Sequence, residues 1–171
     1  ILKAPLKILS QDRKLIQEYG ERLIPITFEQ IPRDFINALL DTEDKRFFEH
    51  SGIDLITVAN ATWQLLANAG DIKTGASTIT MQVVKNVSGA SEVRFIRKFK
   101  EMLLAIKLEQ ALTKQDILTL CLNIVPFGKH AYGIQAAAQT YYGKPVSGLS
   151  LAQMAMLAGI PKAPEAGNPI N

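Results

Sequence analysis

The sequence predicts one mostly α-helical domain preceded by a small β-hairpin. The chain has 171 residues, of which 47% are hydrophobic and 20% charged, so it is long enough to bury a substantial core. From Pro32 onward, apolar residues recur at helical spacing. Before that point, two short runs separated by a polar turn, Leu6–Leu9 and Leu15–Tyr19, are typical of the strands of a hairpin.

Capping signals set the expected helix boundaries. We expect helices from Pro32 through Leu40, from an Asp54 cap to Gly70, from Ser77 or Thr78 to about Asn86, from about Arg94 to Leu112, after a Thr113 cap with Asp116 at the third position, and after a Ser150–Gln153 capping box to about Gly159. The expected organisation is a hairpin and linker over 1–30, a helical domain over 31–165 and the start of a linker over 166–171. Because the chain begins without a leader, we expect it to be part of a longer protein.

Composition excludes several classes of protein. Eleven Gly and eight Pro are too few for a disordered or collagen-like chain. One cysteine and two histidines do not support a disulfide framework or a His- or Cys-rich metal centre. The formal charge of +3 is compatible with an anionic partner but does not require one, and we expect no nucleic-acid partner. The uncharged stretches are shorter than the roughly 20 apolar residues of a membrane span.

Glu43 is a carboxylate within an apolar stripe. Helical spacing places these residues on one narrow face: Ile36, Leu40, Glu43 and Phe47. Asp44 points away from that face. Burial disfavours the charged form of a carboxylate, which suits a general base or acid. The alternative is that the helix ends near Thr42 and leaves Glu43 in solvent. His50, a few residues later, is by itself more typical of a packing or capping histidine than of a ligand.

The segment from Gly75 to Asn86 predicts an anion site at the start of a helix. One face carries the polar residues Thr78, Gln82, Lys85 and Asn86. A Gly-Ala-Ser entry presents free backbone N–H groups to a phosphate or pyrophosphate, with Lys85 two turns further along the helix. The spacing differs from that of a nucleotide P-loop, so ATP is not expected. The alternative is a capped amphipathic helix whose polar face is solvated.

The helix expected from Arg94 carries a group of charges where its pattern changes. We expect its core stripe to be Phe95, Phe99, Met102 and Ile106. Arg97, Lys98 and Glu101 lie on the opposite side, which becomes apolar one turn later. Glu101 is therefore expected to be half-buried beside two cations, unlike an ordinary surface pair. Cys121, in a later apolar run, is expected to be inert core filling.

These segments together resemble the peptidoglycan glycosyltransferase (transglycosylase) domain of class A penicillin-binding proteins and its monofunctional relatives, from about Ile31 to Pro164. The motifs occur in the family's order: Glu43-Asp44-x-x-Phe47-x-x-His50-x-Gly52; Gly75-Ala76-Ser77-Thr78-Ile79-Thr80-x-Gln82-x-x-Lys85-Asn86; Arg97-Lys98-x-Lys100-Glu101; Ile117-Leu118-x-x-x-Leu122-Asn123 with Phe127-Gly128, Gly133-Ile134, Ala137-Ala138 and Tyr142-Gly143-Lys144; and Leu149-Ser150-Leu151-x-Gln153-x-Ala155-x-Leu157-Ala158-Gly159 with Pro161-Lys162-Ala163-Pro164. Two positions depart from the pattern. Met81 replaces a usual Gln and is expected to repack, and Thr119 replaces a usual acidic residue at a secondary contact.

The resemblance implies a lysozyme-like, two-lobed helical fold whose hydrophobic lobe rests on the membrane. It implies that lipid II, a disaccharide-peptide on undecaprenyl pyrophosphate, is polymerised into β-1,4 glycan strands with inversion. Glu43 would be the base, and Lys85, Arg97 and Lys98 would neutralise the departing pyrophosphate. Glu101, the second catalytic residue, would orient these cations, hold a metal or assist the leaving group. The residues expected to bind substrate are Asp44, Phe47, His50, Gly75, Ser77, Thr78, Gln82, Lys85, Asn86, Arg97 and Lys98.

The resemblance also implies cofactors and partners. A divalent cation, Mg²⁺ or Mn²⁺, is expected near Glu101 or Asp44, and no organic cofactor is expected. The expected partners are lipid II, the lipid-linked nascent glycan, the membrane surface and a transpeptidase domain in the same parent chain. The expected location is the periplasmic face of the bacterial cytoplasmic membrane, where moenomycin-type inhibitors would act.

Two other functions remain open at this point. A carboxylate in a lysozyme-like cleft also suits a glycan-cleaving hydrolase or lytic transglycosylase. Such an enzyme expels a sugar and has no pyrophosphate to neutralise, so the cations favour the polymerase. A non-catalytic helical module on a membrane surface would instead use Trp63, Leu65 and Leu66, and Glu43 would be dispensable.

Overall fold

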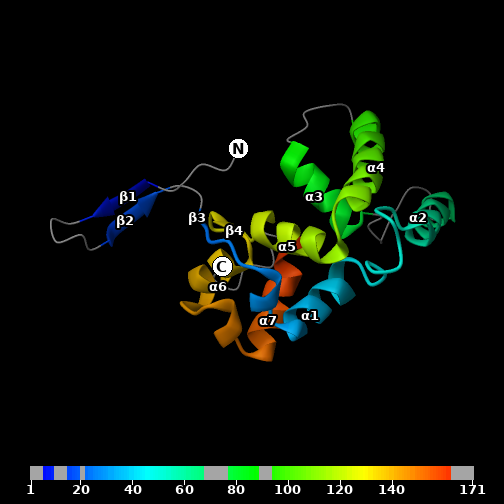
Figure 1. Cartoon of the computed structure of the whole chain (residues 1–171). Helices are drawn as coiled ribbons and strands as arrows, with labels where there is room; N and C mark the ends of the chain where they lie inside the picture. The colour runs from blue at the N-terminus through cyan, green and yellow to red at the C-terminus, as the bar shows by residue number, and fades with distance from the viewer. Residues whose placement is uncertain (1–5, 10–14, 20–21, 68–76, 89–93, 163–171) are drawn as a thin grey trace. The chain divides into compact units, whose positions relative to one another are not determined.

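The computed structural model describes residues 6–9, 15–19, 22–67, 77–88 and 94–162 (Figure 1). Its helices are α1 (Arg33–Glu43), α2 (Leu55–Ala67), α3 (Ile79–Ser88), α4 (Arg94–Ala111), α5 (Lys114–Ile124), α6 (Ile134–Tyr142) and α7 (Leu151–Gly159). Its strands are β1 (Leu6–Leu9), β2 (Leu15–Tyr19), β3 (Arg22–Leu23) and β4 (Ala131–Tyr132). Short 3-10 turns occupy Phe28–Gln30, Val146–Gly148 and Ile160–Lys162. The described chain is therefore mainly α-helical.

The N-terminal hairpin forms as predicted. Strands β1 and β2 pair antiparallel, with Leu6 opposite Tyr19 and Ile8 opposite Gln17. The turn between them lies outside the described residues. A second pairing, between β3 and β4, is parallel and places Arg22 opposite Ala131. No local pattern predicts this pairing, because its two strands are short and far apart in the sequence.

Most helix ends follow from local capping. The Asp116 carboxylate accepts hydrogen bonds from the Thr113 N–H and hydroxyl, and these bonds lower the pKa of Asp116. Ser150 and Gln153 form the predicted capping box at α7. Pro32 precedes α1 instead of opening it, since its carbonyl accepts the first helical N–H groups. The predicted end of α2 at Gly70 lies outside the described residues.

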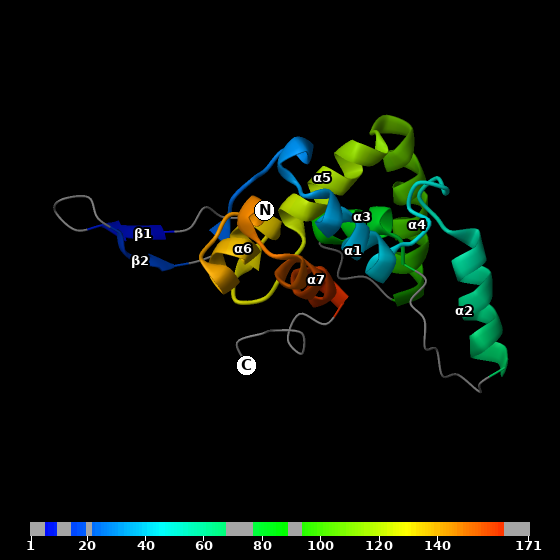
Figure 2. The same ribbon diagram turned by 90° about the horizontal axis from the view of Figure 1, so that it is seen from below.

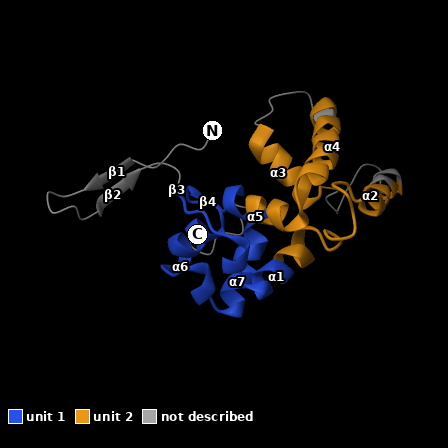
Figure 3. Ribbon diagram, viewed as in Figure 1, with its two compact units in different colours: residues 1–38, 122–171 blue, residues 39–121 orange. Residues whose placement is uncertain are grey.

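The chain divides into two compact units, residues 1–38 with 122–171 and residues 39–121 (Figure 3). In the first unit, the Asn123 side chain accepts from the Ile26 N–H at 2.8 Å and donates to the Ile26 carbonyl at 2.9 Å. Gly133, at a φ of 82°, approaches the Asn123 carbonyl so closely that a Cβ would lie 2.6 Å from its oxygen. That turn therefore requires glycine, for both its backbone angle and its lack of a side chain.

The second unit is built around α3 and α4. Met81, Val84 and Ala105 form its buried cluster, with Met102 and Leu108 packed against them. In both views α4 lies between α3 and α2 (Figures 1 and 2). A Cβ at Gly52 would lie 2.7 Å from the Ala105 carbonyl, so this loop approaches the α4 backbone directly. The predicted repacking of Met81 is confirmed, since Met81 lies in the core.

The predicted core stripe of α4 is wrong at Phe99, although Met102 packs against the buried cluster as expected. Phe99 is 63% exposed, Met102 and Ile106 are half-buried, and the Phe95 side chain lies outside the described part of the structure. The face that packs inward carries Glu101 and Ala105 instead. The reason is close packing: a small Ala105 lets the α4 backbone approach α3 and the Gly52 loop, which a row of phenylalanines would prevent.

Candidate active site

Glu43 is the last residue of α1, but its side chain is not solvated. Its Oε2 accepts a hydrogen bond from Gln82 Nε2 on α3 at 2.8 Å. Its Oε1 is buried and has no hydrogen-bond partner among the described residues. The helix thus ends near the point given by the alternative interpretation, but Gln82 of α3 holds the Glu43 side chain, which is not left in solvent. Gln82 orients one oxygen of Glu43, and no described residue bonds to the other.

Cys121 lies close enough to Glu43 for the carboxylate charge to act on its thiol. Burial, with a smaller contribution from that charge, raises the pKa of the Cys121 thiol to about 12. A thiol with this pKa is protonated at neutral pH and is a poor nucleophile. The structure therefore confirms that Cys121 fills the core.

Asp44 and His50 join the loop after α1 to the start of α3. The Asp44 carboxylate is buried and accepts from the Ile79 N–H at 3.0 Å, and His50 Nε2 lies 3.0 Å from the same oxygen. His50 Nδ1 accepts from the Gly52 N–H, so Nε2 carries the proton that is donated to Asp44. Phe47 is fully buried beside His50. These contacts are internal, and a substrate-binding role for Asp44, Phe47 and His50 stays a prediction.

Thr78 caps α3. Its hydroxyl donates to the Gly52 carbonyl at 2.7 Å and accepts from the Met81 N–H, and the residue is 2% exposed. The capping role of Thr78 is sufficient to explain a polar residue at this position, and no ligand is required to explain it. Gly75, the first residue of the predicted anion site, lies outside the described residues. Lys85 and Asn86 are exposed near the other end of α3, where a ligand could reach them.

Glu101 brings two cations together on α4. The residue is 5% exposed, and its carboxylate lies 3.6 Å from Arg97 Nε and 3.5 Å from Lys98 Nζ. Lys98 Nζ also donates to Ser77 Oγ at 2.5 Å, next to the start of α3. The prediction that Glu101 lies beside both cations is confirmed, although it is buried more deeply than expected. The Arg97 and Lys98 side chains remain 34% and 41% exposed, so they can also contact an anion.

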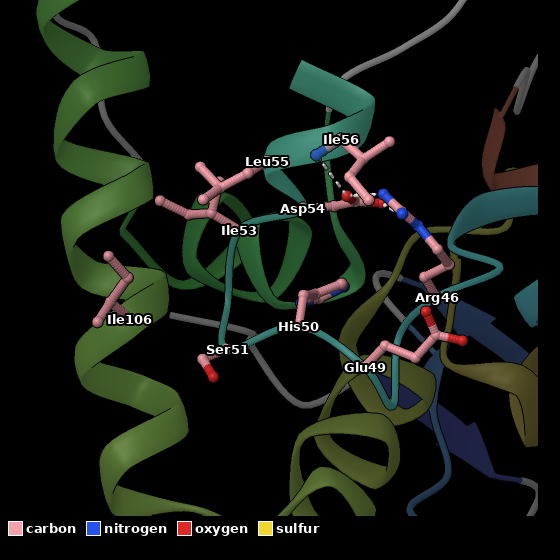
Figure 4. A pocket seen from close by; sticks show the side chains of 9 residues that line it. All are labelled: Arg46, Glu49, His50, Ser51, Ile53, Asp54, Leu55, Ile56 and Ile106. Atoms are coloured by element: carbon pink, nitrogen blue, oxygen red, sulfur yellow. Dashed lines mark hydrogen bonds and ion pairs between the residues drawn. The ribbon is translucent and has the colours of Figure 1, made fainter. Parts of the chain in front are cut away.

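The Arg46–Asp54 pair was missed by the sequence analysis. Asp54 caps α2 by accepting from the Ile56 and Thr57 N–H groups, and Arg46 donates to both of its oxygens. Burial acts to raise the pKa of Asp54, but hydrogen bonds from Thr57 and Arg46 outweigh it and lower that pKa. The pair forms one wall of an open hollow of about 480 Å³, which also contains Ile53 and Ile106 (Figure 4).

The described residues do not fit a metal site made by the protein. No group of three or more His, Cys, Asp or Glu side chains among them is placed to hold an ion. Asp44 is engaged by His50 and the Ile79 N–H, and both oxygens of Glu101 face cations. At both predicted positions the carboxylates are therefore already engaged by protein groups among the described residues. We assign no chemical step to a metal, and the divalent cation stays a prediction.

Thr119, the second departure from the family pattern, bonds within its own helix. Its hydroxyl donates to the Gln115 carbonyl one turn earlier at 2.8 Å. A Ser or Thr hydroxyl commonly makes this contact inside a helix. Thr119 is therefore accommodated within an intact α5.

Comparisons with known proteins show the family to which the chain belongs. A family model described as Transglycosylase matches residues 12–171. The chain is 54% identical over 170 residues to penicillin-binding protein 1A of Pseudomonas aeruginosa, covering 99% of this chain and 21% of that protein. It is 47% identical over 170 residues to penicillin-binding protein 1A of Escherichia coli, covering 99% and 20%. The crystal structure of penicillin-binding protein 1A from Haemophilus influenzae matches with a TM-score of 0.53 at 29% identity, covering 99% of this chain and 16% of that one.

The fold and the site therefore define a transglycosylase domain, and the chain belongs to the transglycosylase family. Its curated relatives are penicillin-binding proteins 1A, of whose length it spans about a fifth. The mainly α, lysozyme-like fold class predicted from the sequence is confirmed.

Proposed function

We propose that this domain polymerises lipid II into β-1,4 glycan strands and releases undecaprenyl pyrophosphate. The observation that carries the proposal is the Glu43 carboxylate, oriented through Oε2 by Gln82 and unpartnered at Oε1 among the described residues. The 4-hydroxyl of the acceptor sugar attacks the anomeric carbon of the donor and transfers its proton to Glu43. The bond from that carbon to pyrophosphate breaks, its electron pair leaves on the pyrophosphate oxygen, and the α-linked donor becomes a β-linked product.

Lys85, Arg97 and Lys98 supply the positive charge that the leaving group requires. A pyrophosphate gains negative charge as the bond breaks, and cations placed beforehand stabilise that charge in the transition state. Both oxygens of Glu101 face Arg97 and Lys98. This contact supports the role of orienting the cations over the roles of metal ligand or proton donor.

The same cations argue against a glycan-cleaving enzyme. A hydrolase or lytic transglycosylase expels a neutral sugar, for which three basic side chains and a buried organising carboxylate have no use. The test incubates the protein with radiolabelled lipid II in one reaction and with preformed glycan in another. We expect long glycan from lipid II, none from a Glu43→Gln variant, and no shortening of the preformed strands. Cleavage of those strands by the wild type would instead support the rival function.

Lys85→Ala is expected to weaken the binding of pyrophosphate-bearing ligands and of a moenomycin-type phosphoglycolipid. An exposed Lys that contacts a phosphate contributes a charge-assisted hydrogen bond, so a loss of about tenfold in affinity is expected. A direct binding titration with the phosphoglycolipid measures this. Lys144→Ala, which removes the same charge from an exposed site in the other unit, is the matched control. Equal affinities for wild type and Lys85→Ala would show that the polar face of α3 is a solvated helix surface that does not bind the phosphate.

We propose that the second unit rests on a membrane through α4. Among the described residues, no helix is both long and apolar enough to cross a membrane. Three large apolar side chains nevertheless share one exposed face of α4: Ile96 (56% exposed), Phe99 (63%) and Leu103 (48%). Exposed Lys100 and Lys107 lie on the same face. An exposed apolar face with interspersed lysines suits an anionic lipid surface.

A periplasmic location at the bacterial cytoplasmic membrane and a transpeptidase domain in the parent chain belong to the same proposal.

Replacing Phe99 and Leu103 together by Ser is expected to reduce association with anionic lipid vesicles. Each side chain transfers apolar area from water into the interface, so the pair should change the partition coefficient about tenfold or more. Co-sedimentation with vesicles of mixed neutral and anionic lipid measures the effect. A matched control replaces Leu151 and Met156 on α7, which are 66% and 48% exposed. If both double variants lose the same vesicle binding, α4 has no special part in it.

A further inference from the structure

Glu109 is a buried carboxylate outside every motif on which the family resemblance depends. It lies on α4, two turns beyond Glu101, and its side chain is 7% exposed. Its Oε1 accepts a hydrogen bond from Thr80 Oγ1 on α3 at 2.6 Å. Lys114 Nζ, at the start of α5, lies 2.8 Å from Oε1 and 2.7 Å from Oε2. Glu109 therefore joins three helices of one unit, with its charge compensated by Lys114.

Lys114 extends this network to the loop after Glu43. Its Nζ also donates to the His50 carbonyl at 2.6 Å and lies 4.4 Å from the centre of the Phe47 ring. His50 Nε2 in turn donates to the Asp44 carboxylate. A Lys that satisfies a carboxylate, a carbonyl and an aromatic face is specifically placed, unlike the mobile Lys of a surface pair.

The contacts close into a ring that begins and ends at α3. Glu109 holds Thr80, and Asp44 holds the N–H of Ile79, the residue just before it. Asp44 directly follows Glu43, and Gln82 lies in the same first turn of α3 as Ile79 and Thr80. Glu43 and Gln82, which share a hydrogen bond, thus each lie within one helical turn of a residue that belongs to the ring. The ring sets how far apart their backbones lie.

We propose that Glu109 is a positioning residue for Glu43. Through Thr80, Lys114 and His50 it holds the start of α3 against the segment after Glu43, so that Gln82 meets the carboxylate in the orientation used for proton transfer. This inference rests on the proposed polymerase function, because it concerns the base of that reaction. Misplacing a catalytic group by about 1 Å can cost about a hundredfold in rate, so loss of this support should act on turnover.

The variants that test this are Thr80→Val and Thr80→Ser in the intact protein that contains this domain. Val keeps the shape and leaves the Glu109–Lys114 pair in place, but removes the hydrogen bond from α3. We expect kcat to fall about tenfold or more with KM for lipid II nearly unchanged, and Ser to restore most of the rate. Glu109→Asp and Glu109→Gln form a second pair, in which Asp should retain more activity because it keeps the charge beside Lys114. A wild-type kcat for Thr80→Val overturns the proposal.

A double-mutant cycle with Gln82→Ala separates positioning from general destabilisation. If Thr80 acts through Gln82, then Thr80→Val should have little further effect on kcat in the Gln82→Ala background. Equal effects in both backgrounds would overturn the proposal. Ser150→Ala, which removes the α7 cap in the other unit, is the control for a lowered melting temperature. A fall in kcat for Ser150→Ala as large as that for Thr80→Val would show that stability alone explains the rate.

Hydrogen exchange distinguishes a failure of this inference from a failure of the proposed function. The Ile79 amide donates to Asp44 inside the ring, so Thr80→Val should accelerate exchange at 79–82 and leave α7 unchanged. This readout does not depend on any reaction. Wild-type protein that makes no glycan would overturn the proposed function alone, whereas unchanged exchange at 79–82 would overturn the positioning role.

Discussion

Glu43→Gln is expected to abolish glycan synthesis while leaving the fold intact. Gln keeps the shape of the side chain and can still accept from Gln82 Nε2, but it cannot take a proton from the acceptor hydroxyl. A positioned general base contributes about a hundredfold to ten-thousandfold in rate, which is enough to bring synthesis below detection. The measurement is conversion of radiolabelled lipid II into glycan, together with the melting temperature of the same preparation.

Gln82→Ala is the informative companion to Glu43→Gln. It removes the group that orients Glu43 Oε2 but leaves the base in place. We expect a smaller loss of rate than for Glu43→Gln, since the carboxylate can still accept a proton from a less favourable orientation. Substantial polymerisation by well-folded Glu43→Gln would remove Glu43 from the mechanism, whatever the companion variant shows.

Glu101→Gln is expected to cause the second largest loss of activity. The carboxylate holds Arg97 and Lys98 beside each other, and without its charge their mutual repulsion spreads them away from the leaving pyrophosphate. This effect is felt mainly in the transition state, where the leaving group carries most charge. The turnover number should therefore fall far more than the ground-state affinity for lipid II.

The effect of Glu101→Gln on stability is expected to be moderate. Loss of an exposed helical ion pair would cost well under about 1 kcal/mol. The structure instead buries the carboxylate, but Arg97 and Lys98 keep 34% and 41% exposure and can be solvated when it is removed. We expect a fall of several degrees in the melting temperature, short of unfolding. A mutant with near-native melting and near-native rate would make Glu101 a structural partner only, and outright unfolding would make it a folding residue.

Features that depend on neighbouring residues were predictable from the sequence. The hairpin, the Thr113–Asp116 cap and the Ser150–Gln153 capping box each involve groups only a few positions apart. Their hydrogen bonds form wherever the local chain adopts the required turn, so residue type and spacing are sufficient. The same holds for Glu101 with its two cations, which lie within one turn of α4.

The sequence by itself thus determined the helical fold class, most helix starts and the grouping of charges along single helices. The tertiary structure decided which face of α4 is buried, because that helix is apolar on more than one side and only the close approach of Gly52 selects Ala105 over Phe99. It also decided the hydrogen-bond partners of two carboxylates. Asp44 accepts from the Ile79 N–H, 35 positions away, and Glu109 accepts from the Thr80 hydroxyl, 29 positions away. Periodicity shows which residues share a face, but it carries no information about the partner that the face will meet, and buried polar networks are defined by those partners.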